Sequence, residues 1–344
     1  RLFRLKRFAL RHKVCLICVA TFVSSVMRKR KTMPSTEDFR GCIGGEMLID
    51  NAITGERRMI KELSKTGEWK DWAVWGIDDL GNLVKQEVVW LGGTGIKEVF
   101  EVVTKSGITL KVSGEEKFFN GKDWVRADTL NPKSPICLST ELKVEAPTDS
   151  ITEDEAELLG WLLGDGYFGS TPELIVRDLD SEQDYITDLC SRLKLFAKVT
   201  KGDGNYRRVQ IQPRVDKFAP KVKNSFLERI KKWKLRGVVK EAKFIPEEFN
   251  FQSEEVISAL LKGLIHADGS ISVRDNLVHI TYFTISPELV NKVQYFLLRM
   301  GIPSRIETIK AKGKSKEGYR LLVNGSEHQN LFAQKIGMLF DKRD

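Results

Sequence analysis

Two apolar segments with nearly the same pattern stand out along the chain, and each of them ends in Asp-Gly. The first runs from Leu158 to Gly166 and the second from Leu260 to Gly269. Polar residues precede each apolar segment, so we predict that each segment is the end of a buried helix of about three turns.

The residues in front of both segments are typical of helix starts. Thr152 and Glu155 have the spacing of a capping box, in which each side chain bonds the other residue's backbone. Ser253 is followed by Glu254 and Glu255, whose charges suit the positive end of a helix. The second start therefore resembles the first.

Small residues recur at four-residue spacing within both predicted helices. Gly160 and Gly164 form one pair, and Gly263 and Ala267 form the other. Residues four apart lie on one helical face, and small side chains there let a second helix approach closely. We predict that the two helices pack backbone to backbone, with the three glycines in the interface.

This packing would place Asp165 and Asp268 side by side at the end of the helix pair. Two carboxylates at such a distance repel unless they are protonated or bridged by cations, and hard oxygen ligands suit Mg²⁺. Such ions stabilise the attacking and leaving oxygens of an in-line phosphoryl displacement, which favours phosphodiester hydrolysis. The alternative is that Asp-Gly merely ends each helix.

The duplicated motif closely resembles that of the LAGLIDADG homing endonucleases, with both copies in one chain as in the monomeric members. The resemblance covers roughly residues 150–344. It implies that Asp165 and Asp268 bind the metal, Mg²⁺ or Mn²⁺ as its substitute, and that a lysine lies nearby, for which Lys201 and Lys310 are the candidates. The sixth motif position, often acidic in the family, is Leu163 in one copy and His266 in the other.

The resemblance further implies an α+β fold of two pseudo-symmetric αββαββα half-domains, with sheets that form a DNA-facing saddle. Short alternating or apolar segments after each motif are consistent with this order. We expect strands at Leu174–Val176, Val209–Ile211, Leu277–Thr284 and Arg320–Val323, and helices at Asp184–Leu195, Pro287–Met300 and Leu331–Phe340.

Charge is segregated along the chain. The formal net charge is +9, and residues 1–40, with eleven Lys/Arg and two acids, account for all of it. Residues 198–243 hold fifteen Lys/Arg and four acids, whereas residues 144–188 hold thirteen acids and one arginine. A basic tract favours phosphate contacts with double-stranded DNA, although any one basic run also fits a solvated helix face. The candidate DNA-binding residues are Lys198, Arg207, Arg208, Arg214, Lys231, Lys232, Lys234, Arg236, Lys312, Lys314 and Arg320.

Residues 41–142 differ in character, with Gly-punctuated apolar alternation that predicts an all-β domain. Three stretches, Cys42–Ile49, Val99–Ser113 and Trp124–Leu130, resemble the N-terminal part of an intein splicing (Hint) domain. An endonuclease inserted into such a domain is the usual layout of a large intein.

That resemblance makes Cys42 a candidate splicing nucleophile. Glu116 stands where the family has a histidine, and a carboxylate does not readily donate a proton at neutral pH. The final His-Asn block is missing before Asp344, so we expect either truncation or loss of splicing. Alternatively, Cys42 is a small buried residue without chemistry.

The predicted organisation has four parts: a flank at 1–40 that we interpret as host sequence, a Hint-like domain at 41–142, and half-domains at 150–245, including a basic linker, and 246–344. The five cysteines suggest neither a disulfide framework nor a zinc site, which favours an intracellular location. The apolar run Val14–Met27 is too short for a membrane span.

The leading functional hypothesis is a Mg²⁺-dependent, site-specific double-strand DNA endonuclease of intein origin that acts as a monomer. The alternatives are a self-splicing intein with a passenger nuclease, an RNA splicing cofactor on the same fold, and a non-cleaving DNA-binding protein.

Overall fold

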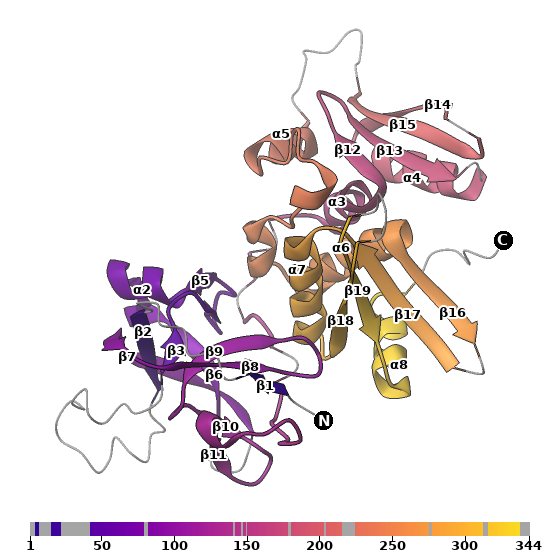
Figure 1. Ribbon diagram of the computed structural model, residues 1–344. Coiled ribbons are helices and arrows are strands. Elements are labelled where there is room, and N and C mark those ends of the chain that lie inside the picture. Colours follow the sequence, from indigo (N-terminus) through magenta and orange to yellow (C-terminus); the bar gives the residue numbers. More distant parts are fainter. Residues whose placement is uncertain are drawn as a thin grey trace. The chain divides into compact units, whose positions relative to one another are not determined.

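The computed structural model divides into two compact units, Arg1–Pro147 and Thr148–Asp344, which we describe separately (Figure 1). It describes residues 4–6, 15–21, 42–78, 82–139, 142–145, 147–148, 150–177, 180–202, 204–214, 224–274, 277–311 and 316–337.

The first unit is built mainly from antiparallel strands. A seven-stranded sheet has the order β1-β8-β9-β3-β2-β7-β6, and two small two-stranded sheets pair β4 with β5 and β10 with β11. The strands are β1 (Arg4–Lys6), β2 (Cys15–Thr21), β3 (Ile43–Gly44), β4 (Leu48–Asp50), β5 (Arg57–Met59), β6 (Ala73–Ile77), β7 (Leu83–Ile96), β8 (Val99–Val103), β9 (Thr109–Ser113), β10 (Lys117–Phe119) and β11 (Trp124–Arg126).

Two features of this unit differ from the sequence prediction. A helix, α2 (Ile60–Thr66), interrupts the predicted all-β pattern and buries Ile60 and Leu63 in a small core. Strand β1 pairs with β8, and β2 pairs with β3 and β7, so parts of the predicted flank at 1–40 belong to the sheet.

The second unit contains two halves with the same order of elements. The first half consists of α3 (Glu153–Asp165), β12 (Gly166–Phe168), β13 (Pro172–Arg177), α4 (Asp180–Arg192), β14 (Leu195–Lys201), β15 (Tyr206–Pro213) and α5 (Ser225–Lys232). The second consists of α6 (Glu254–Asp268), β16 (Gly269–Arg274), β17 (Leu277–Thr284), α7 (Pro287–Arg299), β18 (Ser304–Ile309), β19 (Gly318–Val323) and α8 (Ser326–Lys335). Both halves therefore have the expected αββαββα order.

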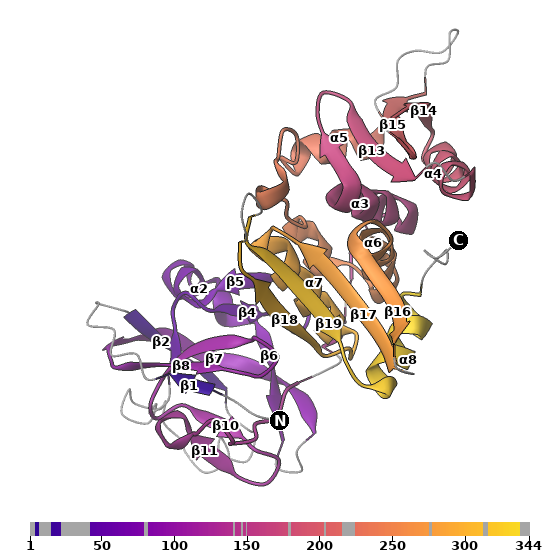
Figure 2. The ribbon, with the colours of Figure 1, turned by 45° about the vertical axis from the view of Figure 1, so that its right-hand side comes forward.

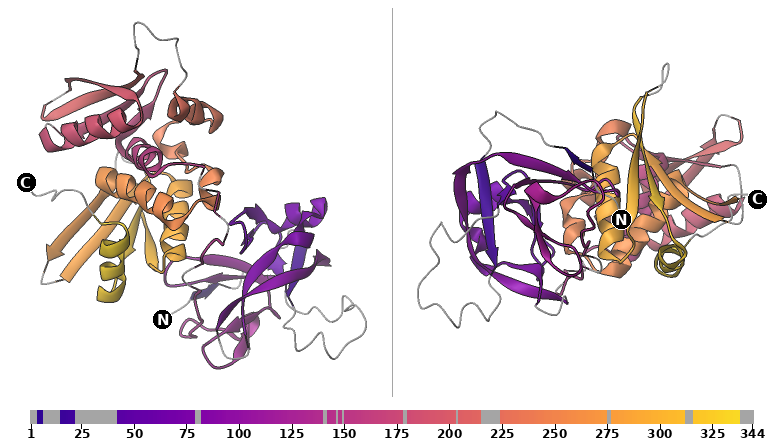
Figure 3. Two further views of the ribbon diagram at one scale, coloured as in Figure 1. Left: turned by 180° about the vertical axis from the view of Figure 1, so that it is seen from behind. Right: turned by 60° about the horizontal axis from the view of Figure 1, so that its bottom comes forward.

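The two four-stranded sheets are also topologically equivalent. Their orders are β12-β13-β15-β14 and β16-β17-β19-β18, and every pair is antiparallel. One face of the second sheet packs on α7 (Figure 2), and α4 runs along the first sheet (Figure 3). The opposite face of each sheet is left for other contacts.

The motif helices α3 and α6 lie side by side at the centre of this unit. A Cβ on Gly160 would lie 2.2 Å from the Leu260 carbonyl oxygen, and a Cβ on Gly263 would lie 2.3 Å from the Glu157 carbonyl oxygen. A backbone contact this close leaves no room for any other residue at either position. One continuous core spans both halves, because side chains from both helices and both sheets pack in it.

The helix starts differ in detail. Thr152 and Glu155 form the predicted capping box, with both reciprocal hydrogen bonds present. Ser253 occupies the equivalent position before α6, but its side chain makes no capping hydrogen bond. The acids of that first turn, Glu254 and Glu255, are present as expected.

The predicted strands fall inside β13, β15, β17 and β19, while some helix bounds shift. Helix α4 starts earlier than predicted and ends at Arg192, because Lys194 adopts a left-handed conformation with φ of 56° and Leu195 begins a strand. Helix α8 starts at Ser326, and Phe340 lies outside the described residues. Across the part of the chain that the structure describes, no helix is both long and apolar enough to cross a bilayer.

Candidate active site

The two motif helices end in the same way. Helix α3 ends at Asp165 and α6 at Asp268, and the next residues, Gly166 (φ −96°, ψ 165°) and Gly269 (φ −97°, ψ 170°), are both extended. A Cβ on either glycine would lie 2.4 or 2.5 Å from the carbonyl oxygen four residues earlier in the helix. The glycines are therefore needed for the sharp departure of each strand, and they are not left-handed helix caps.

The structure brings the two motif acids to the same end of the helix pair. A Cβ built on Gly164, the residue before Asp165, would lie 3.4 Å from Oδ2 of Asp268. The Asp165 side chain is exposed and that of Asp268 is half-buried. Both acids thus lie at the end of the helix pair where the two strands begin, on a side that solvent can reach.

A buried lysine, Lys243, lies beside both acids and was missed by the sequence analysis. It is 3% exposed, and its Nζ donates to the carbonyl oxygens of Leu162, Gly164 and Gly166 at 3.2, 2.6 and 2.9 Å. These oxygens surround the negative end of α3, where a cation is favoured. The ammonium group therefore fixes the end of the helix that carries Asp165.

The electrostatics of Lys243 tie it to the pair of acids. Burial lowers its pKa from the ordinary 10.5 to about 8, while the negative charges of Asp268 and Asp165 oppose that change. The lysine remains mostly charged near neutral pH, and its charge offsets part of the repulsion between the two carboxylates.

The buried phenol of Tyr282 lies close to the second acid. Tyr282 is on β17, directly opposite Gly269 in the register of the sheet. Burial and the negative charge of Asp268 raise its pKa well above 10, so it stays neutral. Tyr282 therefore adds no charge beside Asp268.

The donor set fits a magnesium ion that shares its ligands with a substrate. Within the described residues no group of three or more His, Cys, Asp or Glu side chains could enclose a metal ion. Mg²⁺ usually binds one or two carboxylates together with waters and substrate phosphates, so Asp165 and Asp268 alone suffice on the protein side. Among the residues that the structure describes, there is thus no self-contained site of the kind that zinc uses.

The two lysines predicted from the family resemblance lie at the ends of the outer strands. One row of paired residues crosses the whole first sheet, from Gly166 on β12 through Leu174 and Val209 to Val199 on β14. Strand β14, which ends at Lys201, therefore lies three strand spacings, or about 14 Å, from the start of β12. Lys310 follows the last residue of β18, the outer strand of the second sheet. Their proposed catalytic role stays a prediction, and the lysine that the structure brings to the acids is Lys243.

The uncovered faces of the two sheets carry some of the predicted DNA-binding residues. In the first sheet, Lys198 and Arg208 alternate with the buried Leu195 and Val209 and so point away from the core. In the second, Arg320 is exposed next to the buried Leu321, and Arg305, which the sequence analysis did not single out, occupies the adjacent strand.

These faces also hold acids and exposed apolar side chains. Arg208 lies 3.7 Å from Glu173, and Arg305 lies 3.1 Å from Glu307. The exposed aromatic side chains are Tyr167, Phe196, Tyr206 and Phe283. The mixed surface can contact phosphates through the arginines and base edges through the other side chains.

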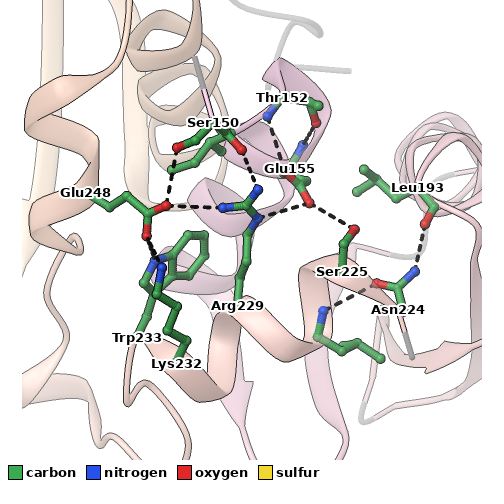
Figure 4. Close-up of polar contacts among 12 residues, drawn as sticks. Ser150, Thr152, Glu155, Leu193, Asn224, Ser225, Arg229, Lys232, Trp233 and Glu248 are labelled. Carbon is green, nitrogen blue, oxygen red and sulfur yellow. Dashed lines mark hydrogen bonds and ion pairs between the residues drawn. The ribbon is translucent and has the colours of Figure 1, made fainter. Parts of the chain in front are cut away.

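Two lysines of the basic run in the connection between the halves contact acids of the protein, and Figure 4 shows the contact of Lys232 with Glu248. Lys231 pairs with Glu228 at 2.6 Å, and Lys232 lies 3.5 Å from Glu248, which also accepts from Trp233 Nε1 at 2.8 Å. Lys234 has a left-handed backbone, and Arg236 is exposed. This run lies on α5 and the following loop and not on either sheet.

Figure 4 also shows how α5 is attached to the start of α3. Arg229 lies 3.5 Å from Glu155 and 3.2 Å from Glu248, and it donates to the Ser150 carbonyl oxygen. These contacts are at the opposite end of α3 from Asp165, so Arg229 stabilises the fold and not the pair of acids.

The remaining predicted residues are placed as follows. Arg207 is two residues before the buried Val209 on β15, so both side chains point to the helix side of the first sheet. Arg214 directly follows the last residue of β15. Lys312 and Lys314 lie outside the described residues. Cys42 is in the first unit, buried, with its Sγ 3.1 Å from Thr94 Oγ1.

Comparison with known proteins places a LAGLIDADG-like domain at residues 255–337, the span from α6 to α8. The replicative DNA helicase DnaB of Rhodothermus marinus is 30% identical over 315 residues, which cover 88% of this chain and 33% of the helicase. DnaB of Synechocystis sp. is 27% identical over 342 residues, covering 94% of this chain and 37% of that protein. The replication factor C small subunit of Methanocaldococcus jannaschii is 24% identical over 319 residues, 88% of this chain but 16% of that protein.

The chain thus spans little more than a third of the length of the helicases it matches. Among solved structures, a mesophilic variant of the homing endonuclease I-DmoI has a TM-score of 0.38 at 13% identity, over 54% of this chain and 95% of that chain. The N-terminal LAGLIDADG domain of DUF199/WhiA has a TM-score of 0.37 at 13% identity, over 56% and 84% of the two chains. At scores this low, the structural likenesses carry no further argument.

Proposed function

We propose that this chain is a site-specific homing endonuclease that hydrolyses both strands of DNA with the help of Mg²⁺. The observation that carries the proposal is the convergence of Asp165, Asp268 and the buried Lys243 at one end of two helices in backbone contact. Duplicated acids with a lysine beside them match the requirements of phosphodiester hydrolysis better than those of a plain helix end.

In this proposal the residues divide the work. Asp165 and Asp268 would hold Mg²⁺, which when bound would supply charge stabilisation and an activated water for phosphodiester hydrolysis. Lys243 holds the end of α3 through its three carbonyl contacts. Its positive charge also lies where negative charge builds up during the displacement.

The DNA would lie on the uncovered faces of the two sheets. We favour four basic side chains as phosphate contacts, because they point away from the core: Lys198 and Arg208 on the first sheet, and Arg305 and Arg320 on the second. Neighbouring aromatic and polar side chains would choose bases, together with the deformability of the duplex. Because both sheets belong to one chain, a monomer could bind a DNA site whose two halves are related by approximate twofold symmetry.

The relatives support an origin as an inserted element. The matched proteins have unlike names, among them a helicase, a replication factor subunit and an aminotransferase, and this chain corresponds to only part of each. A segment shared by otherwise different proteins is expected of an intein, which fits the upstream resemblance around Cys42. The target would then be the host gene without the insertion, inside the cell.

The test is cleavage of a plasmid that carries the uninterrupted host junction, with Mg²⁺ or with EDTA. We expect Mg²⁺-dependent linearisation by the wild type and its loss in Asp165→Asn and in Asp268→Asn. Asp154→Asn is the matched control, because Asp154 is on the same helix but pairs with Arg192 at 3.0 Å. Salt-sensitive binding without cleavage would instead favour a non-cleaving DNA-binding protein, and preference for a structured RNA would favour a splicing cofactor.

A further inference from the structure

One row of polar side chains crosses the uncovered face of the first sheet, just beyond the motif acid. It starts at Tyr167, two residues after Asp165, and continues through the paired residues Glu173, Gln210 and Lys198. On β12, β13 and β15 both neighbours of the row's residue along the strand are buried. These side chains therefore point away from the core, towards the face where the DNA is proposed to lie.

The second sheet has an equivalent row. It starts at Ser270, also two residues after its motif acid, and continues through Thr281 and Leu322 to Arg305. The outer strand carries a cation in both rows, Lys198 in one and Arg305 in the other. The two middle positions have opposite chemistry, because a carboxylate and an amide in the first row correspond to a hydroxyl and an aliphatic side chain in the second.

The middle of the first row is held in one orientation. Glu173 Oε1 accepts from Gln210 Nε2 at 2.8 Å, and Glu173 Oε2 lies 3.7 Å from Arg208 Nε. A carboxylate only accepts hydrogen bonds, so the amide nitrogen of Gln210 is turned towards it. Gln212 donates to Gln210 Oε1 at 3.5 Å, which leaves that oxygen a second lone pair. One N–H and one lone pair of the same amide therefore remain for a ligand.

An N–H beside an acceptor oxygen is the pair of groups that adenine takes in the major groove, through N7 and N6. A leucine in the same place offers only apolar contact, which suits the methyl group of thymine. The carboxylate of Glu173 would repel phosphates, so the middle of the row is better suited to base edges than to the backbone. Four strands span about 14 Å, close to the major-groove width of about 12 Å, which leaves the outer cations at the phosphates.

We propose that Gln210 selects an adenine in the half-site on the first sheet, with Glu173 as the residue that positions its amide. Leu322 selects a thymine, through the methyl group, at the related position of the other half-site. This inference rests on the proposed function, because it needs the duplex to lie on the uncovered faces. It adds the chemistry of one base position in each half-site.

The experiment is selection of duplexes by the full chain from a library with a randomised central region, in EDTA so that the strands stay intact. We expect the wild type to select adenine at one position and thymine at another, at equal distances from the centre of the site. Gln210→Ala should lower the preference for adenine at least about 10-fold at that position alone. Gln210→Leu should change the selected base there to thymine, a gain that misfolding cannot produce. Gln183→Ala, on α4, is the matched control and keeps the wild-type preferences.

Two further variants separate positioning from phosphate contact. Glu173→Gln removes a negative charge and lets the Gln210 amide turn, so affinity for random duplex should rise while the preference for adenine weakens. Loss of structure would lower both. Lys198→Ala should reduce the slope of log affinity against log salt concentration by about one and leave the base preferences unchanged.

An unchanged preference for adenine in Gln210→Ala or in Gln210→Leu would overturn this inference alone, because cleavage of the junction plasmid by the wild type would still stand. A wild type that selects no sequence at all would overturn it together with the proposed function. A change of preference confined to one position supports the assignment of Gln210.

Discussion

The contact between the motif helices can be tested by exchanging two small residues across it. Gly164 on α3 faces Ala267 on α6, and a Cβ added to Gly164 would lie 2.2 Å from the Ala267 Cβ. The next neighbours would be Asp268 Oδ2 at 3.4 Å and Ala267 Cα at 3.5 Å, which are ordinary contacts. Gly164→Ala alone should therefore clash with one methyl group, and Ala267→Gly should remove that clash.

The expected magnitudes follow from this geometry. Two carbon atoms in contact prefer about 3.5–4.0 Å, so Gly164→Ala must move the helices apart by more than about 1 Å. Overpacking of this kind costs about 1–3 kcal/mol, against a gain of at most about 1 kcal/mol from helix propensity. We expect a net loss of about 1–2 kcal/mol for Gly164→Ala, a loss of about 1 kcal/mol for Ala267→Gly, and a double variant close to the wild type.

Native-state hydrogen exchange of the α3 and α6 amides measures these free energies within the second unit. The double-mutant cycle should give a favourable coupling of about 2–3 kcal/mol between the two positions. If Gly164→Ala were stabilising, or if the two effects were simply additive, the helices would not be in the contact described here. Gly160→Ala provides a further comparison, because it meets the Leu260 backbone and no single side-chain change can relieve it.

Four further predictions concern other parts of the chain. Lys243→Met should lower the DNA cleavage rate at least about 100-fold while binding of the same duplex, measured by anisotropy, changes little; equal cleavage would remove Lys243 from the site. Arg320→Ala should reduce the slope of log affinity for DNA against log salt concentration by about one. Lys232→Ala should leave that slope unchanged, because Lys232 is paired with Glu248 in the wild type. The pKa of Glu116 is raised by burial from 4.5 to about 7 in the folded protein, so folding favours the protonated carboxyl. The resulting contribution to the free energy of unfolding is complete below pH 4.5 and is lost as the pH rises through 7, by at most about 3 kcal/mol. In urea unfolding, the free energy of unfolding of Glu116→Gln should depend less on pH between about 5.5 and 8.5 than that of the wild type. Thr152→Ala should lower the stability of the second unit by about 1 kcal/mol, because the side-chain cap of α3 is lost.

The parts of the fold that the sequence predicts are those fixed by local pattern. The small residues at 160, 164 and 263 lie on one face of each helix by spacing alone, and the Asp-Gly pairs mark where both helices end. The capping box at Thr152 is likewise a local signal, and it forms as expected. These features need no knowledge of the rest of the chain.

Lys243 could not be predicted, because its position depends on tertiary structure. It is 78 residues after Asp165 and 25 before Asp268, in an irregular connection with no motif of its own. The one local signal is a lysine that stands directly before the apolar pair Phe244 and Ile245, which is weak by itself. Its partners are backbone carbonyls at the end of α3, and these leave no trace in the sequence.

The shifted end of α4 has a similar cause. A left-handed residue that stops a helix is usually glycine, but here Lys194 adopts that conformation with φ of 56°. The apolar spacing continues through Leu195, so the pattern alone extends the helix into the strand that follows. Likewise, the properties of Glu116 come from its burial, which its position in the motif does not reveal.

The central claim is that Asp165 and Asp268 together bind the divalent cation of a nuclease. The most direct measurement is a Mn²⁺ titration of the full chain bound to the uninterrupted-junction duplex, in which electron paramagnetic resonance reports the free ion and the duplex alone is subtracted. We predict binding in the wild type and in Asp154→Asn, and its loss in the Asp165→Asn/Asp268→Asn double variant. Equal Mn²⁺ binding by all three proteins would contradict the account.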